Sequence, residues 1–274
     1  MAQTMTSASL SPQQTRSDPA AAKPRWEAFV INLARAAERW AFMERQLRAL
    51  AIPFHRVEAV DGQTLRFPMP EVSDSSYRYL HGRHLSPSEV GCYLSHIKAI
   101  DIFLAGDLDY ALILEDDALM ERDIGAVIDA ALDCRGDWDI LRLSTVNTGR
   151  YFPVTRVAGR ALGVCFTREK GAAGYVLSRR AAQLFRERLM PMRLAYDIAF
   201  DLEYLMGLKA LGAMPMPINQ ETRTDTQIQY NIRKLPAWRY LTVFPFRAAI
   251  ETARVVSRLG LYLLLRFRHR AEGR

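Results

Sequence analysis

The fold class is decided by one stretch of sequence, Tyr110-Ala111-Leu112-Ile113-Leu114-Glu115-Asp116-Asp117. Its first five residues are apolar, a pattern typical of a short strand buried on both faces of a sheet. The three carboxylates that follow cannot all be buried without compensation. Ligands of open α/β sheets bind beyond the carboxyl ends of the strands. We therefore predict a central strand over residues 110–114 that ends in a binding site.

Strand and helix patterns alternate on both sides of this stretch, which predicts an α/β fold with a mixed sheet flanked by helices. Ser86-Pro87-Ser88-Glu89 is typical of a helix start, with serine at the cap and proline at the first helical position. Residues 64–85 lack periodicity and are expected to form a long loop over a site. The other expected elements are strands 29–33, 52–57, 139–144 and 175–178, and helices 40–50, 86–105, 179–189 and 198–211.

The positive charge of the chain is concentrated in its last segment. The formal net charge is +7, and residues 239–274 hold eight arginines against two glutamates. The remaining body is nearly neutral, which excludes a nucleic-acid surface spread over the fold, because phosphate contacts need many clustered Lys and Arg side chains. Cys92, Cys134 and Cys165 lie far apart, so neither a disulfide framework nor a thiolate zinc site is indicated, and a reducing compartment is expected.

The chain divides into three expected parts. Residues 1–25 have the composition of a disordered leader, with no signal-peptide pattern. Residues 26–236 form the globular domain, and residues 237–274 form a basic amphipathic tail. The window Val255 to Leu265 is interrupted by Arg258 and is shorter than the roughly 20 residues of a membrane span. The tail either lies on an anionic bilayer or docks on its own domain or in an oligomer interface.

The acidic triplet has two interpretations. Carboxylates one residue apart can hold a hard divalent cation, which keeps several waters and takes further oxygens from a substrate diphosphate. Alternatively, Glu115, Asp116 and Asp117 form a solvated acidic turn, as acids at strand ends commonly do.

Several segments, in order, resemble glycosyltransferase family 25. They are Val30-Ile31-Asn32-Leu33 with Arg35 and Arg39, Asp61-Gly62, Gly91-Cys92-Tyr93-Leu94-Ser95-His96, Ile113-Leu114-Glu115-Asp116-Asp117, and Gly171 to Ala181. The family includes bacterial lipooligosaccharide galactosyl- and glucosyltransferases and the collagen galactosyltransferases. The resemblance implies a nucleotide-binding, Rossmann-like fold of the GT-A type, a UDP-sugar donor, a Mn²⁺ or Mg²⁺ cofactor and inversion at the anomeric carbon.

The resemblance also implies roles for individual residues on the donor side. Asp117 is the expected metal ligand, and Glu115 contacts the metal, through water, or the ribose. Asp116 supports the turn. Nucleotide contacts are expected from Asn32, Arg35, Arg39 and Asp61. For the two arginines, the alternative is an ordinary solvated charge on a helix.

Three residues are catalytic candidates. Inverting transfer needs a base for the acceptor hydroxyl, and Asp197 or Asp201 is expected to supply it. Either can instead be an acid stabilised at a helix N-terminus. His96 is a candidate by the Ser95-His96 match, and its alternative role is structural. The polar segment 220–227 resembles a later family motif but contains no histidine, so it provides no third metal ligand of that kind.

The resemblance predicts a metal-dependent, inverting transferase that moves galactose or glucose from a UDP-sugar to a lipooligosaccharide or other glycan. A glycolipid acceptor would place the chain on the cytoplasmic face of the bacterial inner membrane. The first alternative is a non-catalytic glycan-binding or sugar-nucleotide-binding protein with the same fold. The second, a metal-dependent phosphotransferase or nuclease, needs a glycine-rich phosphate loop or a basic body, and the sequence has neither.

Overall fold

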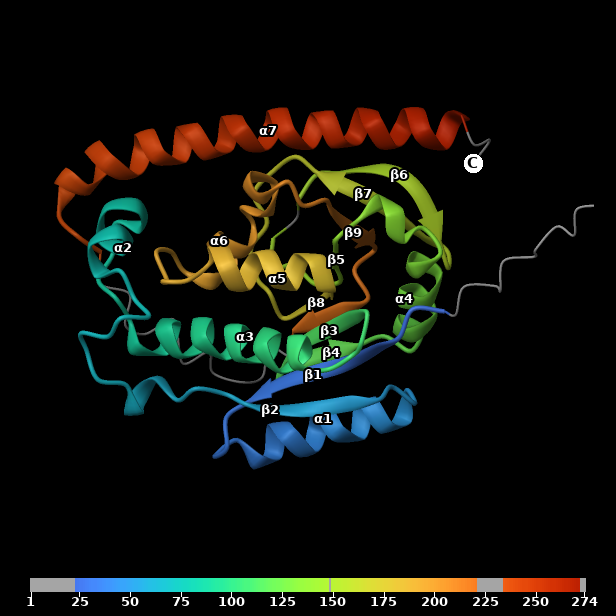
Figure 1. The fold of residues 1–274 in the computed structure, drawn as a ribbon, viewed down its shortest axis with the longest axis horizontal. Coiled ribbons are helices and arrows are strands. Elements are labelled where there is room, and N and C mark those ends of the chain that lie inside the picture. Colours follow the sequence, from blue (N-terminus) through green and yellow to red (C-terminus); the bar gives the residue numbers. More distant parts are fainter. Residues whose placement is uncertain (1–22, 148, 221–233, 272–274) are drawn as a thin grey trace, which may run out of the picture.

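A mixed eight-stranded sheet forms the centre of the computed structural model, which describes residues 23–147, 149–220 and 234–271 (Figure 1). The strand order is β2-β1-β3-β8-β5-β9-β7-β6. These strands are β1 (Trp26–Asn32), β2 (Phe54–Glu58), β3 (Tyr110–Glu115), β5 (Ile140–Arg142), β6 (Tyr151–Val157), β7 (Arg160–Cys165), β8 (Gly174–Ser178) and β9 (Ala210–Met214). A separate pair joins β4 (Ala118–Met120) to β10 (Ile218–Gln220).

Helices cover both faces of the sheet, which confirms the predicted α/β class (Figure 1). They are α1 (Ala37–Ala49), α2 (Asp74–His81), α3 (Pro87–Ala105), α4 (Ile124–Leu132), α5 (Arg179–Arg188), α6 (Tyr196–Phe200) and α7 (Tyr240–Ala271). Four 3₁₀ turns are η1 (Gly62–Thr64), η2 (Arg135–Asp137), η3 (Glu203–Met206) and η5 (Ala237–Arg239). The predicted leader 1–25 lies outside the described residues except for its last three, as does most of the segment 220–227.

Strand β3 lies inside the sheet, as its apolar run predicts. It pairs parallel with β1 and antiparallel with β8, and residues 110–114 are all buried. Alternate side chains enter two cores: Ala111 and Ile113 pack on the α3 side, while Leu112 and Leu114 pack on the α1 and α4 side. Each fully buried Leu or Ile side chain contributes roughly 1.5–3 kcal/mol to folding. The two cores hold the end of β3 fixed relative to β1.

The prediction of one helix over residues 198–211 is wrong. The chain there forms α6 and η3 and then turns at Gly207, whose φ of 68° lies in the left-handed region that favours glycine. Ala210–Met214 becomes β9 because this apolar run finds two strand partners, β5 and β7. The loop expected over residues 64–85 also contains a helix, α2, which ends at Gly82 with φ 73°.

The tail is one long helix, α7, which lies along one side of the domain from α2 to β6 and β7 (Figure 1). Its expected basic face is not solvated, because Arg254 and Arg258 are 1% and 3% exposed and pair with acids of the domain. Ile250 of the same helix is buried, whereas Val256 and Phe267 are exposed. No helix of the described residues has the length and apolar character needed to cross a membrane.

Candidate functional site

A cavity of about 750 Å³ opens at the carboxyl ends of β1 and β3. The parallel pairing of these strands places Ile31 beside Glu115, so the chain turns out of both strands at the same edge. The volume falls within the roughly 300–1,000 Å³ of small-molecule sites. Its walls come from residues 31–39, residues 59–63, one face of α3 and the acidic triplet. A cavity therefore lies at the end of the strand where the sequence predicts a binding site, and its function stays a prediction.

Two glycines allow the segment after β2 to approach α3 closely. A Cβ on Gly62 would lie 2.2 Å from the carbonyl oxygen of Pro87, and a Cβ on Gly91 would lie 2.6 Å from that of Val60. Ser95 fixes the approach, because its Oγ accepts a hydrogen bond from the backbone N–H of Val60 at 2.8 Å. This packing places Asp61 and the face of α3 on the same cavity.

The cavity is rich in negative charge. Five lining side chains are acidic (Glu38, Asp61, Glu115, Asp116 and Asp117) and two are basic (Arg35 and Arg39). A diphosphate would meet net repulsion from such a wall unless a cation came between them.

Both arginines are paired with cavity acids. Arg35 pairs with Asp61, and Arg39 Nη1 lies 3.0 Å from Asp116 Oδ1. Asn32 does not line the cavity but donates from Nδ2 to Asp116 Oδ2 at 2.7 Å. Asp116 is therefore held on both oxygens, an arrangement that suits the supporting role predicted for it.

Asp117 differs from its neighbour, because its buried Oδ1 has no hydrogen-bond partner among the described residues. Burial, then the charges of Glu115 and Asp116, raises the pKa of Asp117 to about 7. A buried carboxylate without a partner is costly, and a bound cation would offset that cost. The donor set of Asp117 and Glu115 therefore fits a hard divalent cation.

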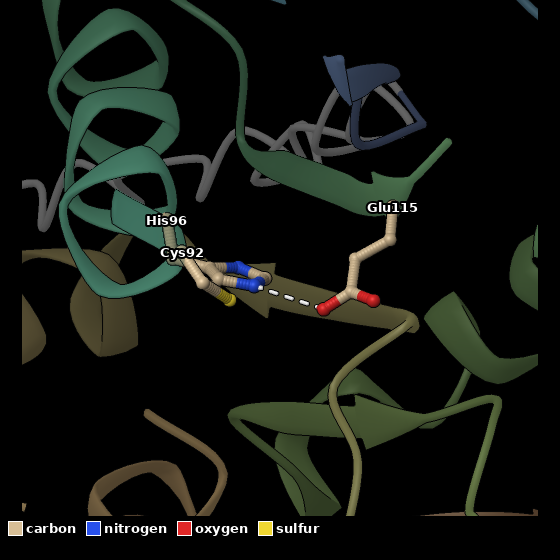
Figure 2. Close-up of side chains that lie close together, drawn as sticks. All are labelled: Cys92, His96 and Glu115. Atoms are coloured by element: carbon tan, nitrogen blue, oxygen red, sulfur yellow. Dashed lines mark hydrogen bonds and ion pairs between the residues drawn. The ribbon is translucent and has the colours of Figure 1, made fainter. Parts of the chain in front are cut away.

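His96 lies between the triplet and a group of tyrosines. Its Nε2 is 3.4 Å from Glu115 Oε1, and its Nδ1 is 2.9 Å from the hydroxyl of Tyr175. The imidazole ring stacks on Tyr196 with 3.9 Å between ring centroids. Figure 2 shows His96 and Cys92 projecting from α3 toward Glu115. Cys92 was not among the predicted site residues, although its spacing of four from His96 is a readable signal of a shared helical face.

The two candidate bases lie in different surroundings, and neither lines the cavity. Asp197 is in the first turn of α6, where its Oδ1 accepts from the N–H of Ile198 at 2.9 Å, and burial raises its pKa. Asp201 is fully buried. Its Oδ1 lies 2.8 Å from Arg258 Nη2, and its Oδ2 lies 2.8 Å from Arg254 Nη2. Both oxygens of Asp201 are therefore committed to arginines.

An acid-lined cavity at the carboxyl edge of the sheet lies where α/β proteins commonly bind their ligands. Residues 26–200 match the profile described as glycosyltransferase family 25 (LPS biosynthesis protein). The chain therefore belongs to glycosyltransferase family 25, as its motifs indicated.

Two relatives show how far the similarity extends. Lacto-N-neotetraose biosynthesis glycosyltransferase LgtE of Neisseria meningitidis is 31% identical over 203 residues, covering 70% of this chain and 70% of that protein. Procollagen galactosyltransferase 1-A of Xenopus laevis is 29% identical over 168 residues, covering 57% of this chain and 27% of that protein. The chain thus spans about a quarter of the length of the procollagen enzyme.

A third relative, of Rattus norvegicus, is named probable inactive glycosyltransferase 25 family member 3 and is 32% identical over 130 residues, 43% of this chain and 22% of that protein. Among solved structures, A197 from STIV aligns with a TM-score of 0.38 and 10% identity over 76% of this chain and 99% of that one. Similarity at that level carries no argument about the fold.

Proposed function

We propose that this chain is an inverting hexosyltransferase of the GT-A type that transfers galactose or glucose from a UDP-sugar to a lipooligosaccharide or related glycan. The observation that carries the proposal is the unpartnered, buried Asp117 oxygen in an acid-rich cavity at the carboxyl edge of the sheet. Family membership supplies the reaction class, and the cavity supplies a place for a nucleotide diphosphate and a divalent cation.

In this proposal, Asp117 and Glu115 hold a Mn²⁺ or Mg²⁺ ion. When bound, such an ion supplies Lewis-acid stabilisation of the charge that develops on a departing diphosphate. Arg35 and Arg39 are paired with carboxylates at the cavity wall and can exchange them for phosphate oxygens, which guanidinium groups bind in the same forked geometry. Asn32 fixes Asp116, and through it the turn that carries Asp117.

We assign the role of general base to Asp197 in preference to Asp201. Burial raises the pKa of Asp197, which increases its basicity, and among the described residues its carboxylate accepts one hydrogen bond, from the N–H of Ile198. Asp201 would have to break ion pairs with two buried arginines to accept a proton. Asp197→Asn should lower kcat roughly 10²–10⁴-fold with an unchanged melting temperature. Full turnover in this variant would contradict the assignment.

The outward side of α7 is the proposed contact with a membrane surface. It exposes large apolar side chains, namely Leu241, Phe244, Val255, Val256, Leu259, Leu263, Leu264 and Phe267. The neighbouring side chains Arg266 and Arg270 are also exposed. An apolar face with basic neighbours suits the interface of an anionic bilayer and a glycolipid acceptor, at the cytoplasmic face of the inner membrane.

Flotation of the full chain with anionic phospholipid vesicles tests this contact. Val256→Asp with Leu264→Asp should abolish flotation, whereas Glu44→Gln on exposed α1 serves as a control and should float as the unchanged chain does. Flotation that survives the double substitution would reject α7 as the membrane contact.

The reaction itself is tested by screening nucleotide-sugars with the full chain, with and without Mn²⁺. We expect hydrolysis or transfer from one UDP-hexose only when the cation is present. A non-catalytic sugar-nucleotide-binding protein, the alternative suggested by the inactive rat relative, would bind the donor without turnover.

A further inference from the structure

We propose that Cys92, His96 and Glu115 form a second metal site, which takes a borderline-soft divalent cation such as Zn²⁺ on the wall of the cavity. The site differs in ligand class from the oxygen-only pair of Asp117 and Glu115, because it offers a thiolate, an imidazole and one carboxylate. It shares Glu115 with the proposed catalytic pair, but its metal binding can be tested with metal alone, without any assay of sugar transfer.

The three ligand atoms already converge. Cys92 Sγ, a ring nitrogen of His96 and a carboxylate oxygen of Glu115 lie within 4.8 Å of one another, and all three residues line the cavity (Figure 2). In a tetrahedral zinc site with bonds of about 2.0–2.3 Å, neighbouring ligand atoms lie about 3.3–3.8 Å apart. The 3.4 Å between His96 Nε2 and Glu115 Oε1 already fits such an edge. The Glu115 side chain is 28% exposed, so it can rotate and shorten the remaining distances between the ligand atoms.

The scaffold around the ligands is rigid. Cys92 and His96 project from one face of α3 because they are four residues apart, and Glu115 ends a strand that is buried between two cores. The His96 ring is clamped by stacking on Tyr196, and its Nδ1 is engaged by the Tyr175 hydroxyl. Metal-binding histidines commonly have their second ring nitrogen fixed by such a partner.

One tautomer of His96 favours a cation, whereas in the other Nε2 donates its hydrogen to Glu115. When Nδ1 donates its hydrogen to Tyr175, the lone pair of Nε2 points at a carboxylate oxygen of Glu115. Two acceptors at that separation repel each other unless a proton or a metal ion lies between them. All three residues line the cavity, so water or a ligand could reach an ion bound between them.

The electrostatics around Cys92 also favour a cation over a free thiolate. The carboxylates of Glu115, Asp197, Glu89 and Asp117 surround Cys92 with negative charge. The same negative field attracts a divalent ion, which displaces the thiol proton when it binds. Because Glu115 is common to both sets of ligands, a zinc ion here would also draw this carboxylate away from Asp117.

Cobalt(II) titration of the full chain tests the site, because Co²⁺ replaces zinc and its absorption spectrum reports both thiolate ligation and tetrahedral geometry. We expect one Co²⁺ per chain, with a thiolate-to-metal charge-transfer band that added Zn²⁺ removes. Cys92→Ser should abolish that band. Cys134→Ser, in a half-buried cysteine outside the cavity, should leave it unchanged.

Two further variants separate ligation from folding. Glu115→Gln should weaken Co²⁺ binding at least about tenfold, and Tyr175→Phe, which removes the hydroxyl that positions His96, should weaken it roughly 10–100-fold. Thermal melts of each metal-free variant establish that it is folded. A charge-transfer band that persists in Cys92→Ser, or a Co²⁺ spectrum with no thiolate band in the unchanged chain, would overturn the proposal.

Discussion

The molecule contains two groups of acidic side chains that differ in the number of basic side chains paired with them. The first, the α7 cluster, pairs three buried acids with three buried arginines: Glu169, Asp201 and Glu203 with Arg142, Arg254 and Arg258. The second group, the cavity acids, consists of Glu115, Asp116 and Asp117, whose ionic partners among the described residues are Arg39 and His96.

The difference explains what each group can do. Charges in the α7 cluster are balanced and desolvated together, so its carboxylates serve to hold α7 against the domain. Glu169 and Glu203 each also have one buried oxygen without a hydrogen bond, but their other oxygen pairs with an arginine. The cavity acids exceed their cationic partners, and Asp117 has no ion pair among the described residues. A carboxylate that the protein itself does not neutralise is available to a bound cation. The number of nearby arginines therefore determines whether a group of acids stabilises the packing of α7 or is available to bind a cation.

The largest expected effect is on the α7 cluster. Arg258→Met should lower the free energy of unfolding by about 3–5 kcal/mol, because it takes the closest cation from buried Glu203 and one of the two closest from buried Asp201. Urea unfolding measures the loss. Arg266→Met, at an exposed position on the same helix, is the matched control and should change the stability by less than about 0.5 kcal/mol. Equal stability of the two variants would show that the cluster does not hold α7.

The next effect concerns the cavity acids. Asp117→Asn should reduce sugar transfer by roughly 10²–10³-fold, since the cation would lose its main ligand. The same change should leave the stability of the metal-free chain unchanged or higher, because it removes a buried, unpaired carboxylate. Turnover with Mn²⁺ and a thermal melt without it measure the two quantities. A variant that loses stability but keeps transfer would place Asp117 with the structural acids.

The sequence predicted the cavity better than the α7 cluster, and the reason is distance along the chain. The run 110–117 carries its own signal, because apolar residues followed at once by carboxylates indicate a buried strand with a binding site at its end. Helix α3 likewise begins at Pro87 and ends at Ala105, as its N-terminal residues and spacing predicted. In both segments, residues close together in the sequence are sufficient to specify the secondary structure.

Secondary structure and burial could not be predicted where they depend on contacts with residues far away in the sequence. Ala210–Met214 is apolar enough for a helix or a strand, and only its pairing with β5 and β7 decides. Arg254 and Arg258 have the spacing of a solvated face, and nothing near them in the sequence reveals the acids at 201 and 203. The group of Cys92, His96 and Glu115 was predictable in part. The spacing of Cys92 and His96 places them on one helical face, whereas Glu115 comes from another element.

A change of pH should affect the stability of a third region, which is cationic and lies near the start of α7. His81 is buried, and neither ring nitrogen has a hydrogen-bond partner among the described residues. Burial, then the charges of Arg83, Arg247 and Arg168, lowers its pKa to about 3. Since the pKa is about 6.5 in the unfolded chain, the unfolded state binds more protons between these values. This contribution to stability is present above pH 6.5 and is lost as the pH falls toward 3.

Urea unfolding at pH 7.5 and pH 5.0 measures this effect. The unchanged chain should lose about 2 kcal/mol more between these two pH values than His81→Met does, at about 1.4 kcal/mol per pH unit below 6.5. His84→Asn, at an exposed histidine three residues away, should behave as the unchanged chain does. An identical pH dependence in all three proteins would mean that His81 takes up its proton without cost.

The smallest effect on activity is expected at Arg39, which forms an ion pair with the cavity acid Asp116. Its Nη1 lies 3.0 Å from Asp116 Oδ1, and its side chain is 32% exposed, so it can reach a donor phosphate without leaving a buried site. Arg39→Lys keeps the charge but loses the forked geometry, and we expect about a tenfold higher KM for the nucleotide-sugar, with kcat within about twofold. Arg45→Lys, at an exposed position of α1 outside the cavity, should leave KM unchanged. A loss of stability in Arg39→Lys as large as that in Arg258→Met would mean that the ion pair with Asp116 is structural, and the distinction between balanced and available acids would then fail at this residue.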